Sequence, residues 1–201
     1  MDKSKRNYFR TDSGDAITSF AEHLFKKLII ARDLNYDSIV FLFIGSDRST
    51  GDSLGPMIGH KLCHFQFDDI FFRGTLESPV HARNLSSAVS EVSKISKNPF
   101  IIAVDACLGR MENVGMITLG DGPIKPGSGV NKDLAPVGNI HITGIVNYGG
   151  FMDFIILQNT RLSIVVKMAD AICEGIELAI NHFEFDCGRT LIKYPKNSLT
   201  N

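Results

Sequence analysis

Residues 40–56 read Val40-Phe-Leu-Phe-Ile-Gly-Ser-Asp-Arg-Ser-Thr-Gly-Asp-Ser-Leu-Gly-Pro56, and the rest of the chain can be interpreted outward from them. An apolar run over residues 39–44 stops at Gly45, polar and small residues follow, and a new apolar pattern begins at Leu54. This order predicts a buried strand, a glycine-bounded loop and a helix with Pro56 in its first turn. Because ligands bind at loops that leave the carboxyl ends of strands in an open α/β sheet, we expect this loop to form one wall of an active site.

Strand and helix patterns alternate on both sides of this stretch. Strands are expected over residues 39–44, 70–76, 100–104, 114–119 and 140–146, and helices over 15–32, 54–65, 82–97, 151–157 and 162–183. The alternation is typical of βαβ units and predicts an α/β fold with a mostly parallel sheet, extended by an antiparallel strand at 114–119. Residues 120–138 are expected to form a long loop, and residues 190–194 a short edge strand.

Length and composition limit the kind of protein. The 201 residues fit one α/β domain over 15–187, between a flexible N-terminal tail (1–14) and a C-terminal tail (188–201). The 21 Lys and Arg residues nearly balance the 22 Asp and Glu residues, so we expect neither nucleic acid nor an anionic membrane as a partner. The apolar runs are too short to span a bilayer, and the basic N-terminus lacks the apolar core of a secretory signal, so we expect a cytoplasmic protein. The four cysteines are widely spaced, which argues against a disulfide framework and a paired-cysteine zinc site.

Two aspartates are the first candidates for chemistry. Asp52 stands where a phosphate-binding loop would have a lysine, which excludes a nucleoside triphosphate site; alternatively, Asp52 only caps the following helix. Asp105 follows the apolar strand at 100–104, where an acid is costly to bury unless it is hydrogen-bonded, metal-bound or catalytic. A lone acid at a strand end is more often a turn or cap residue. If the two strands are neighbours, however, the two carboxylates face each other, either as an acid–base couple that activates water or as two ligands of a divalent metal ion.

His141 is the third candidate, because it follows the long loop. It would complete an Asp52/Asp105/His141 cluster as a metal ligand or a general acid–base, although a lone histidine is usually structural or exposed. Cys107 is interpreted as a small buried residue rather than as a nucleophile paired with His141. The histidines to which we assign only surface or packing roles are His60, His64, His81 and His182.

The candidate substrate-binding residues lie in the two glycine-containing loops. The first loop offers charged and hydroxyl side chains, and the second offers backbone amides as donors for an oxyanion or a peptide carbonyl. Arg48 and Lys132 would add positive charge near the site. The candidates are Asp47, Arg48, Thr50, Gly127, Ser128, Gly129 and Asn131.

Five motifs carry a resemblance to a known family. They are Ile44-Gly-Ser-Asp-Arg-Ser-Thr-Gly-Asp-Ser-Leu-Gly-Pro56, Gly74-Thr-Leu-Glu-Ser-Pro-Val-His81, Val104-Asp-Ala-Cys-Leu-Gly109, Lys125-Pro-Gly-Ser-Gly-Val-Asn-Lys132 and His141-Ile-Thr-Gly-Ile-Val146. From residue 39 to residue 179 the chain resembles the sporulation protein family of the DUF1256 type, related to the spore germination protease. More distantly it is similar to the hydrogenase maturation proteases, which implies a three-layer α/β/α sandwich of the phosphorylase/hydrolase-like type.

The resemblance also implies residue roles. In the germination protease, the acids of the motifs Thr-x-Asp-x-Leu-Gly-Pro and Val-Asp-Ala are proposed as an aspartic-type catalytic pair, and they fall on Asp52 and Asp105. The Pro-Gly-Ser-Gly-Val motif of that protease matches residues 126–130. In the maturation proteases a glutamate, an aspartate and a histidine recognise the metal of a nickel-bearing substrate, and they align with Asp52, Asp105 and His141.

The leading hypothesis is a sporulation-associated endopeptidase that hydrolyses a protein or peptide substrate through Asp52 and Asp105, with His141 lining the site and no cofactor. The first alternative is a metal-recognising or metal-dependent protein of the maturation type, in which Asp52, Asp105 and His141 bind a divalent metal ion. The second is a non-catalytic sporulation module that binds a partner in the same pocket. A location in the cytoplasm, forespore or spore interior fits all three, and a homo-oligomer is left open.

Overall fold

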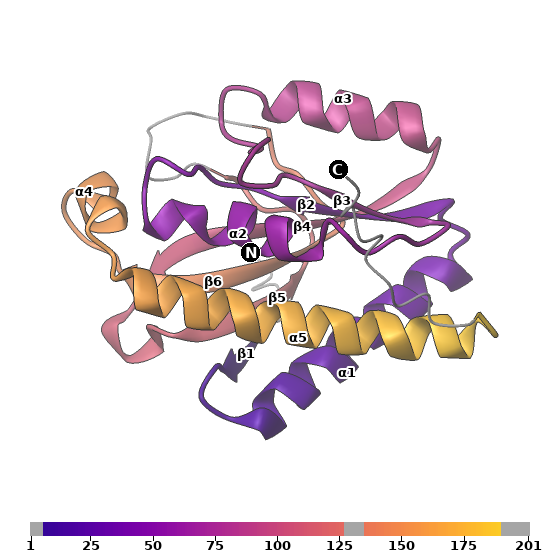
Figure 1. The fold of residues 1–201 in the computed structure, drawn as a ribbon, viewed down its shortest axis with the longest axis horizontal. Helices are drawn as coiled ribbons and strands as arrows, with labels where there is room; N and C mark the ends of the chain where they lie inside the picture. Colours follow the sequence, from indigo (N-terminus) through magenta and orange to yellow (C-terminus); the bar gives the residue numbers. More distant parts are fainter. Residues whose placement is uncertain (1–5, 127–134, 190–201) are drawn as a thin grey trace, which may run out of the picture.

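The computed structural model describes residues 6–126 and 135–189. Within them, the strands form one sheet in the order β1-β5-β6-β4-β2-β3 (Figure 1). The strands are β1 (Arg6–Arg10), β2 (Ser38–Phe43), β3 (Ile70–Arg73), β4 (Pro99–Gly109), β5 (Met116–Asp121) and β6 (Ile140–Tyr148). The helices are α1 (Gly14–Asp33), α2 (Leu54–Leu62), α3 (Leu85–Ile95), α4 (Asp153–Gln158) and α5 (Leu162–Asp186), with the 3₁₀ turns η1 (Gly51–Ser53) and η2 (Met111–Asn113).

The sheet is mostly parallel, as predicted. Strands β3, β2, β4 and β6 run parallel to one another, and β5 and β1 extend the sheet in the antiparallel sense. Every residue of β2 is buried, which explains the uninterrupted apolar run in the sequence, because a parallel strand covered on both faces meets no solvent. None of the helices in the described part of the chain is long and apolar enough to cross a membrane.

Helices cover both faces of the sheet, so the molecule has the predicted three layers. Helices α1, α2 and α5 pack together on one face, and α3 lies on the other (Figure 1). The buried apolar residues divide accordingly: Phe41 and Phe43 of β2 belong to the larger cluster, whereas Leu42 packs in a smaller one with Leu85 of α3. Because successive strand residues point to opposite faces, a single central strand supplies both cores.

Several predicted boundaries are shifted in the structure, and two of the differences affect the sheet and the site. Residues 6–10, expected to belong to the flexible tail, form β1, which pairs with β5; the strand is only five residues long and contains Arg6 and Arg10, so its apolar signal is weak. Strand β4 continues to Gly109, so Asp105 lies inside a strand rather than after one. The strand expected at 190–194 falls outside the described residues.

Candidate active site

The loop between β2 and α2 folds back against the end of β2. The backbone N–H of Gly45 donates to the carbonyl of Val80 (2.8 Å), and that of Ser46 donates to the carbonyl of Asp52 (3.0 Å). Gly45 has a φ of 148°, and a Cβ at this position would lie 2.0 Å from the carbonyl oxygen of Asp52. Glycine is therefore required here both for its backbone conformation and for the close approach of Asp52.

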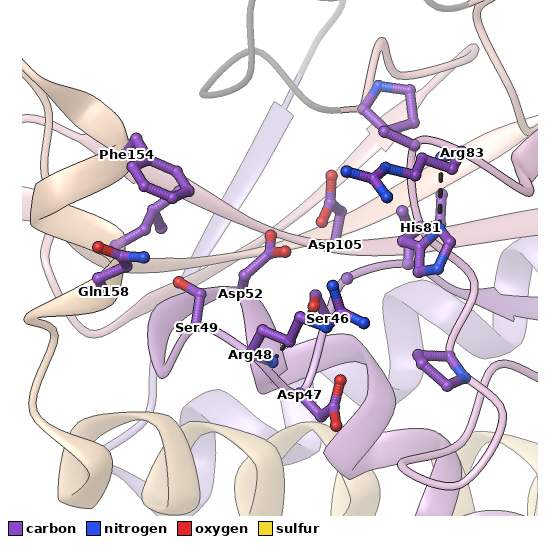
Figure 2. Close-up of a pocket in the computed structure, with 16 residues that line it drawn as sticks. Ser46, Asp47, Arg48, Ser49, Asp52, His81, Arg83, Asp105, Phe154 and Gln158 are labelled. Carbon is purple, nitrogen blue, oxygen red and sulfur yellow. Dashed lines mark hydrogen bonds between the residues drawn. The ribbon is translucent and has the colours of Figure 1, made fainter.

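The Asp52 side chain points into a cavity at the carboxyl edge of the sheet (Figure 2). Asp52 belongs to η1, and no side chain makes a cap hydrogen bond at the start of α2 in the described structure, so a role only as helix cap is not supported. Burial raises the pKa of the Asp52 carboxyl, and the neighbouring His81 opposes that rise. Asp52 thus has a nearby group that favours its ionised form.

Asp105 enters the same cavity from β4, the strand next to β2 in the sheet (Figure 2). It is only 8% exposed, and its Oδ1 accepts a hydrogen bond from the backbone N–H of Ala106 (2.8 Å). Burial raises the pKa of the Asp105 carboxyl well above its ordinary value, and the charge of Asp52 raises it further. The two aspartates therefore have unequal environments: the deeper one favours the protonated form, and the shallower one is more easily ionised.

The cavity has a volume of about 460 Å³. The two carboxylates lie between the β2–α2 loop, the segment after β3, and α4 (Figure 2). Its wall at α4 is largely apolar, and the opposite side carries two arginines. The remaining lining residues are Ile44, Gly45, Ser46, Asp47, Arg48, Ser49, Pro79, His81, Ala82, Arg83, Pro126, Phe154, Leu157 and Gln158.

His81 is a site residue that the sequence argument missed. Val80 forms a parallel bridge with Ile44, which brings the segment after β3 alongside the end of β2. The His81 backbone N–H donates to Asn84 Oδ1 (2.7 Å), and the imidazole Nδ1 accepts from the backbone N–H of Arg83 (3.3 Å). With Nδ1 as an acceptor, a neutral His81 carries its proton on Nε2. The sequence contains a motif that ends at His81, but no residue near it in the sequence indicates that His81 lies beside a carboxylate.

His141 does not join the two aspartates, so the predicted trio is wrong. On β6 it pairs with Ala103 of β4, two residues before Asp105, and it does not line the cavity. Its Nδ1 lies 2.9 Å from the carbonyl of Gly122, and its ring packs against Gly120, where a Cβ would come within 2.6 Å of two ring atoms. Burial lowers the pKa of the His141 imidazole, which suits a neutral structural residue.

The position of His141 also argues against the hypothesis of a metal site made by Asp52, Asp105 and His141, because His141 would be the third ligand. Across residues 6–126 and 135–189, no group of three His, Cys, Asp or Glu side chains is placed to hold a metal ion. Cys107 is half-buried and does not line the cavity. Burial raises the pKa of its thiol, although a hydrogen bond with Thr143 lowers that pKa in part. A thiolate nucleophile is therefore disfavoured.

The predicted substrate-binding residues have different outcomes. Asp47 and Arg48 line the cavity. Thr50 does not; its carbonyl accepts a hydrogen bond from Ser53 Oγ (2.7 Å) inside the loop. The other predictions lie outside the described residues: Gly127, Ser128, Gly129, Asn131 and Lys132.

The chain is similar to known proteins in sequence, and it partly matches a solved structure. The sequence model of the family described as "Protein of unknown function (DUF1256)" matches residues 8–175. The "Uncharacterized protein YyaC" of Bacillus subtilis (strain 168) is 55% identical over 140 residues, which cover 70% of this chain and 68% of that protein. A crystal structure of the [NiFe] hydrogenase maturation protease HycI from Thermococcus kodakarensis KOD1 matches 74% of this chain and 99% of its own, with a TM-score of 0.45 and 16% identity. The range matched by the family includes every residue that lines the cavity.

Proposed function

The chain belongs to the DUF1256 family, and from the geometry of its cavity we propose that it is an endopeptidase in which Asp52 and Asp105 activate a water molecule. The observation that carries the proposal is the unequal carboxylate pair. Asp105 is buried and has a strongly raised pKa, whereas Asp52 is more accessible and has His81 beside it. An acid–base mechanism needs two groups in different protonation states at the same pH. The pKa is raised for both carboxyl groups, but more strongly for Asp105, which supports protonated Asp105 beside ionised Asp52.

Each carboxyl group has one task in the proposed reaction. Ionised Asp52 accepts a proton from water as the water oxygen bonds to the carbonyl carbon of the substrate, and protonated Asp105 hydrogen-bonds to the carbonyl oxygen as it gains negative charge. The tetrahedral intermediate then collapses: the carbon–nitrogen bond breaks, Asp52 returns its proton to the leaving amine, and Asp105 keeps its own. Water is consumed, a carboxyl group and an amine are released, and the enzyme regains its starting protonation state.

The remainder of the cavity supports a peptide substrate. Its volume of about 460 Å³ lies in the range of pockets that bind small molecules, which is enough for the residues next to a scissile bond. Phe154 and Leu157 provide an apolar wall beside the carboxylates. Ser46 also lines the cavity, and its Oγ accepts a hydrogen bond from the backbone N–H of Arg48 (3.2 Å). We extend the proposal to sporulation, with a protein of the forespore or spore interior as the substrate, on the basis of the resemblance of the sequence motifs to those of the spore germination protease.

Replacement of each acid by its amide tests the mechanism. We expect Asp52→Asn and Asp105→Asn each to lower the rate of cleavage at least about 100-fold, the range for loss of a general acid or base. The assay incubates purified protein with a denatured protein extract from spore-forming cells and counts new N-termini by mass spectrometry. Asp170→Asn is the matched control, because Asp170 pairs with Lys61 on the exposed side of α5.

Two outcomes would overturn the proposal. Full turnover in either active-site variant would remove the carboxylate pair as the catalyst. Cleavage that is abolished by a chelator and restored by one divalent metal ion would replace it with the metal-dependent alternative.

A further inference from the structure

Helix α4 and the turn before it expose an unusual concentration of large apolar side chains. Phe151, Met152, Phe154 and Ile155 are between 47% and 92% exposed, and we call these four residues the α4 surface. Asp153 is the only charged residue among positions 148–158, and its Oδ1 accepts a hydrogen bond from the backbone N–H of Gly150 (2.9 Å). Exposed apolar side chains that cluster in this way mark interaction sites more often than scattered ones do.

The α4 surface is held in place by the fold. The backbone N–H groups of Ile155 and Ile156 donate to the carbonyl of Met152, and Met152 has a φ of 72°, a left-handed conformation that non-glycine residues rarely adopt. On the inner side, Leu157 contacts Gly51 of η1 so closely that a Cβ on Gly51 would lie 2.9 Å from it. The strained turn is thus maintained by packing against the loop that carries Asp52.

The α4 surface is continuous with the candidate active site. Phe154 belongs to the surface and also lines the cavity, and Figure 2 shows its ring on the wall that faces Asp52. In Figure 1, α4 projects from the end of the molecule beyond the three layers. A ligand that leaves the carboxylates along this wall would therefore pass over Phe154, which is flanked in the sequence by exposed members of the α4 surface.

We propose that the α4 surface binds an apolar segment of the polypeptide substrate, adjacent to the bond held over Asp52 and Asp105. This inference rests on the proposed endopeptidase function, but the binding of a peptide to the α4 surface can be measured without cleavage. An extended chain advances about 7 Å for every two residues and places alternate side chains on one face, so a segment of about four residues would reach from Phe154 over the α4 surface. The substrate is the occupant because Phe154 belongs both to the α4 surface and to the wall of the cavity that would hold the scissile bond.

Peptide binding to full-length protein tests the inference. The probe is a fluorescein-labelled peptide with an uncharged Gly-Ala-Gly centre and a Phe-Ile-Ala-Leu flank, and its partner probe carries Ser-Gln-Ala-Thr in place of that flank. Binding is measured by fluorescence anisotropy in the Asp105→Asn background, in which we expect cleavage to be at least about 100-fold slower. We expect the apolar probe to bind at least about tenfold more tightly, and the double variant Phe151→Ser/Ile155→Ser to abolish that preference.

The control and the alternative outcomes separate this inference from the proposed function. Phe185→Ser makes the same change at a side chain that is 82% exposed near the end of α5, and it should leave binding of both probes unchanged. Equal binding of the two probes, or a preference that survives the double variant, would overturn the inference even if the protein cleaves peptides. A dimer in analytical ultracentrifugation that dissociates in the double variant, without any effect on probe binding, would assign the surface to self-association instead. Loss of the preference in the double variant of a protein that cleaves nothing would support the inference and contradict the proposed function.

Discussion

Asp105 shows how one residue links the chemistry of the site to the stability of the fold. A carboxyl group whose pKa is raised by burial and by Asp52 keeps its proton in the folded state at a pH where the unfolded chain has released it. Below the ordinary aspartate pKa of ~4, the Asp105 carboxyl is protonated in both the folded and the unfolded state, so it does not change the free energy of unfolding with pH. As the pH rises toward neutrality, the unfolded state is increasingly favoured, so the free energy of unfolding falls.

Asp105→Asn should therefore stabilise the protein in a pH-dependent way. The amide has no proton to release and can still accept the hydrogen bond from Ala106. We expect the free energy of unfolding of the variant to exceed that of the wild type by on the order of 1 kcal/mol at pH 7, with the difference shrinking toward pH 4. Urea unfolding at several pH values measures it. Asp170→Asn, at an exposed ion pair, should show no comparable trend, and a destabilised Asp105→Asn variant at pH 7 would contradict the argument.

The residues of the site were predictable to the extent that their positions depend on local sequence. Asp52 lies in the loop that follows one apolar run, and Asp105 directly follows another. Both runs have the pattern of buried strands, so the α/β pattern predicts that the two residues lie at the same edge of the sheet. His81 reaches the site through the long-range bridge between Val80 and Ile44, which no local pattern encodes. His141 fails because strand register, which the sequence does not show, places it two residues short of Asp105.

At the scale of elements, α2 begins in close contact with Ile44, the residue that follows β2. A Cβ at Gly55 would lie 2.1 Å from the carbonyl oxygen of Ile44, so any larger residue must move the helix away from the strand. We expect Gly55→Ala to lower the free energy of unfolding by about 2–3 kcal/mol, although alanine is the better helix former. The displacement would also disturb η1 and hence Asp52, so cleavage activity should fall as well.

Gly14→Ala is the control for this prediction. Gly14 is the first residue of α1, and a Cβ there would meet no atom within 4 Å. The substitution should be neutral or slightly stabilising in the same urea unfolding experiment. Equal effects of the two substitutions would show that helix propensity, and not the contact between α2 and β2, decides the outcome.

The elements themselves were predictable where apolar runs were long. Strands β2, β4 and β6 lie in the middle of the sheet, and their buried residues give continuous signals. Strand β1 lacks this signal because it is a short edge strand, in which most side chains are not buried. Its position next to β5 depends on pairing between residues more than 100 positions apart, which periodicity cannot reveal.

For the whole molecule, the order of the strands explains where the site lies. The chain passes from β2 outward to β3 through α2, and then returns across β2 to β4 through α3. The connection that leaves β2 leads through α2 to β3 at one edge of the sheet, whereas the connection that leaves β4 leads through η2 to β5, on the other side of β6. The two connections therefore diverge toward opposite edges of the sheet, which opens a crevice between them. Ligands in open α/β folds bind at this kind of switch point, and Asp52 and Asp105 come from its two sides.

Strand β1 forms the edge of the sheet opposite β3, and the Phe9 side chain packs β1 against the core. The ring of Phe9 packs against Phe20 (5.5 Å between centroids) and His23 (5.4 Å) of α1, whereas the neighbouring Tyr8 is 51% exposed. We expect Phe9→Ala to lower the free energy of unfolding by about 3 kcal/mol and Tyr8→Ala by less than about 1 kcal/mol, both measured by urea unfolding. Because loss of β1 uncovers the backbone of β5, Phe9→Ala should also increase aggregation, seen by light scattering. Similar stability losses in the two variants would mean that backbone pairing alone holds β1, with no contribution from the side chain that faces α1.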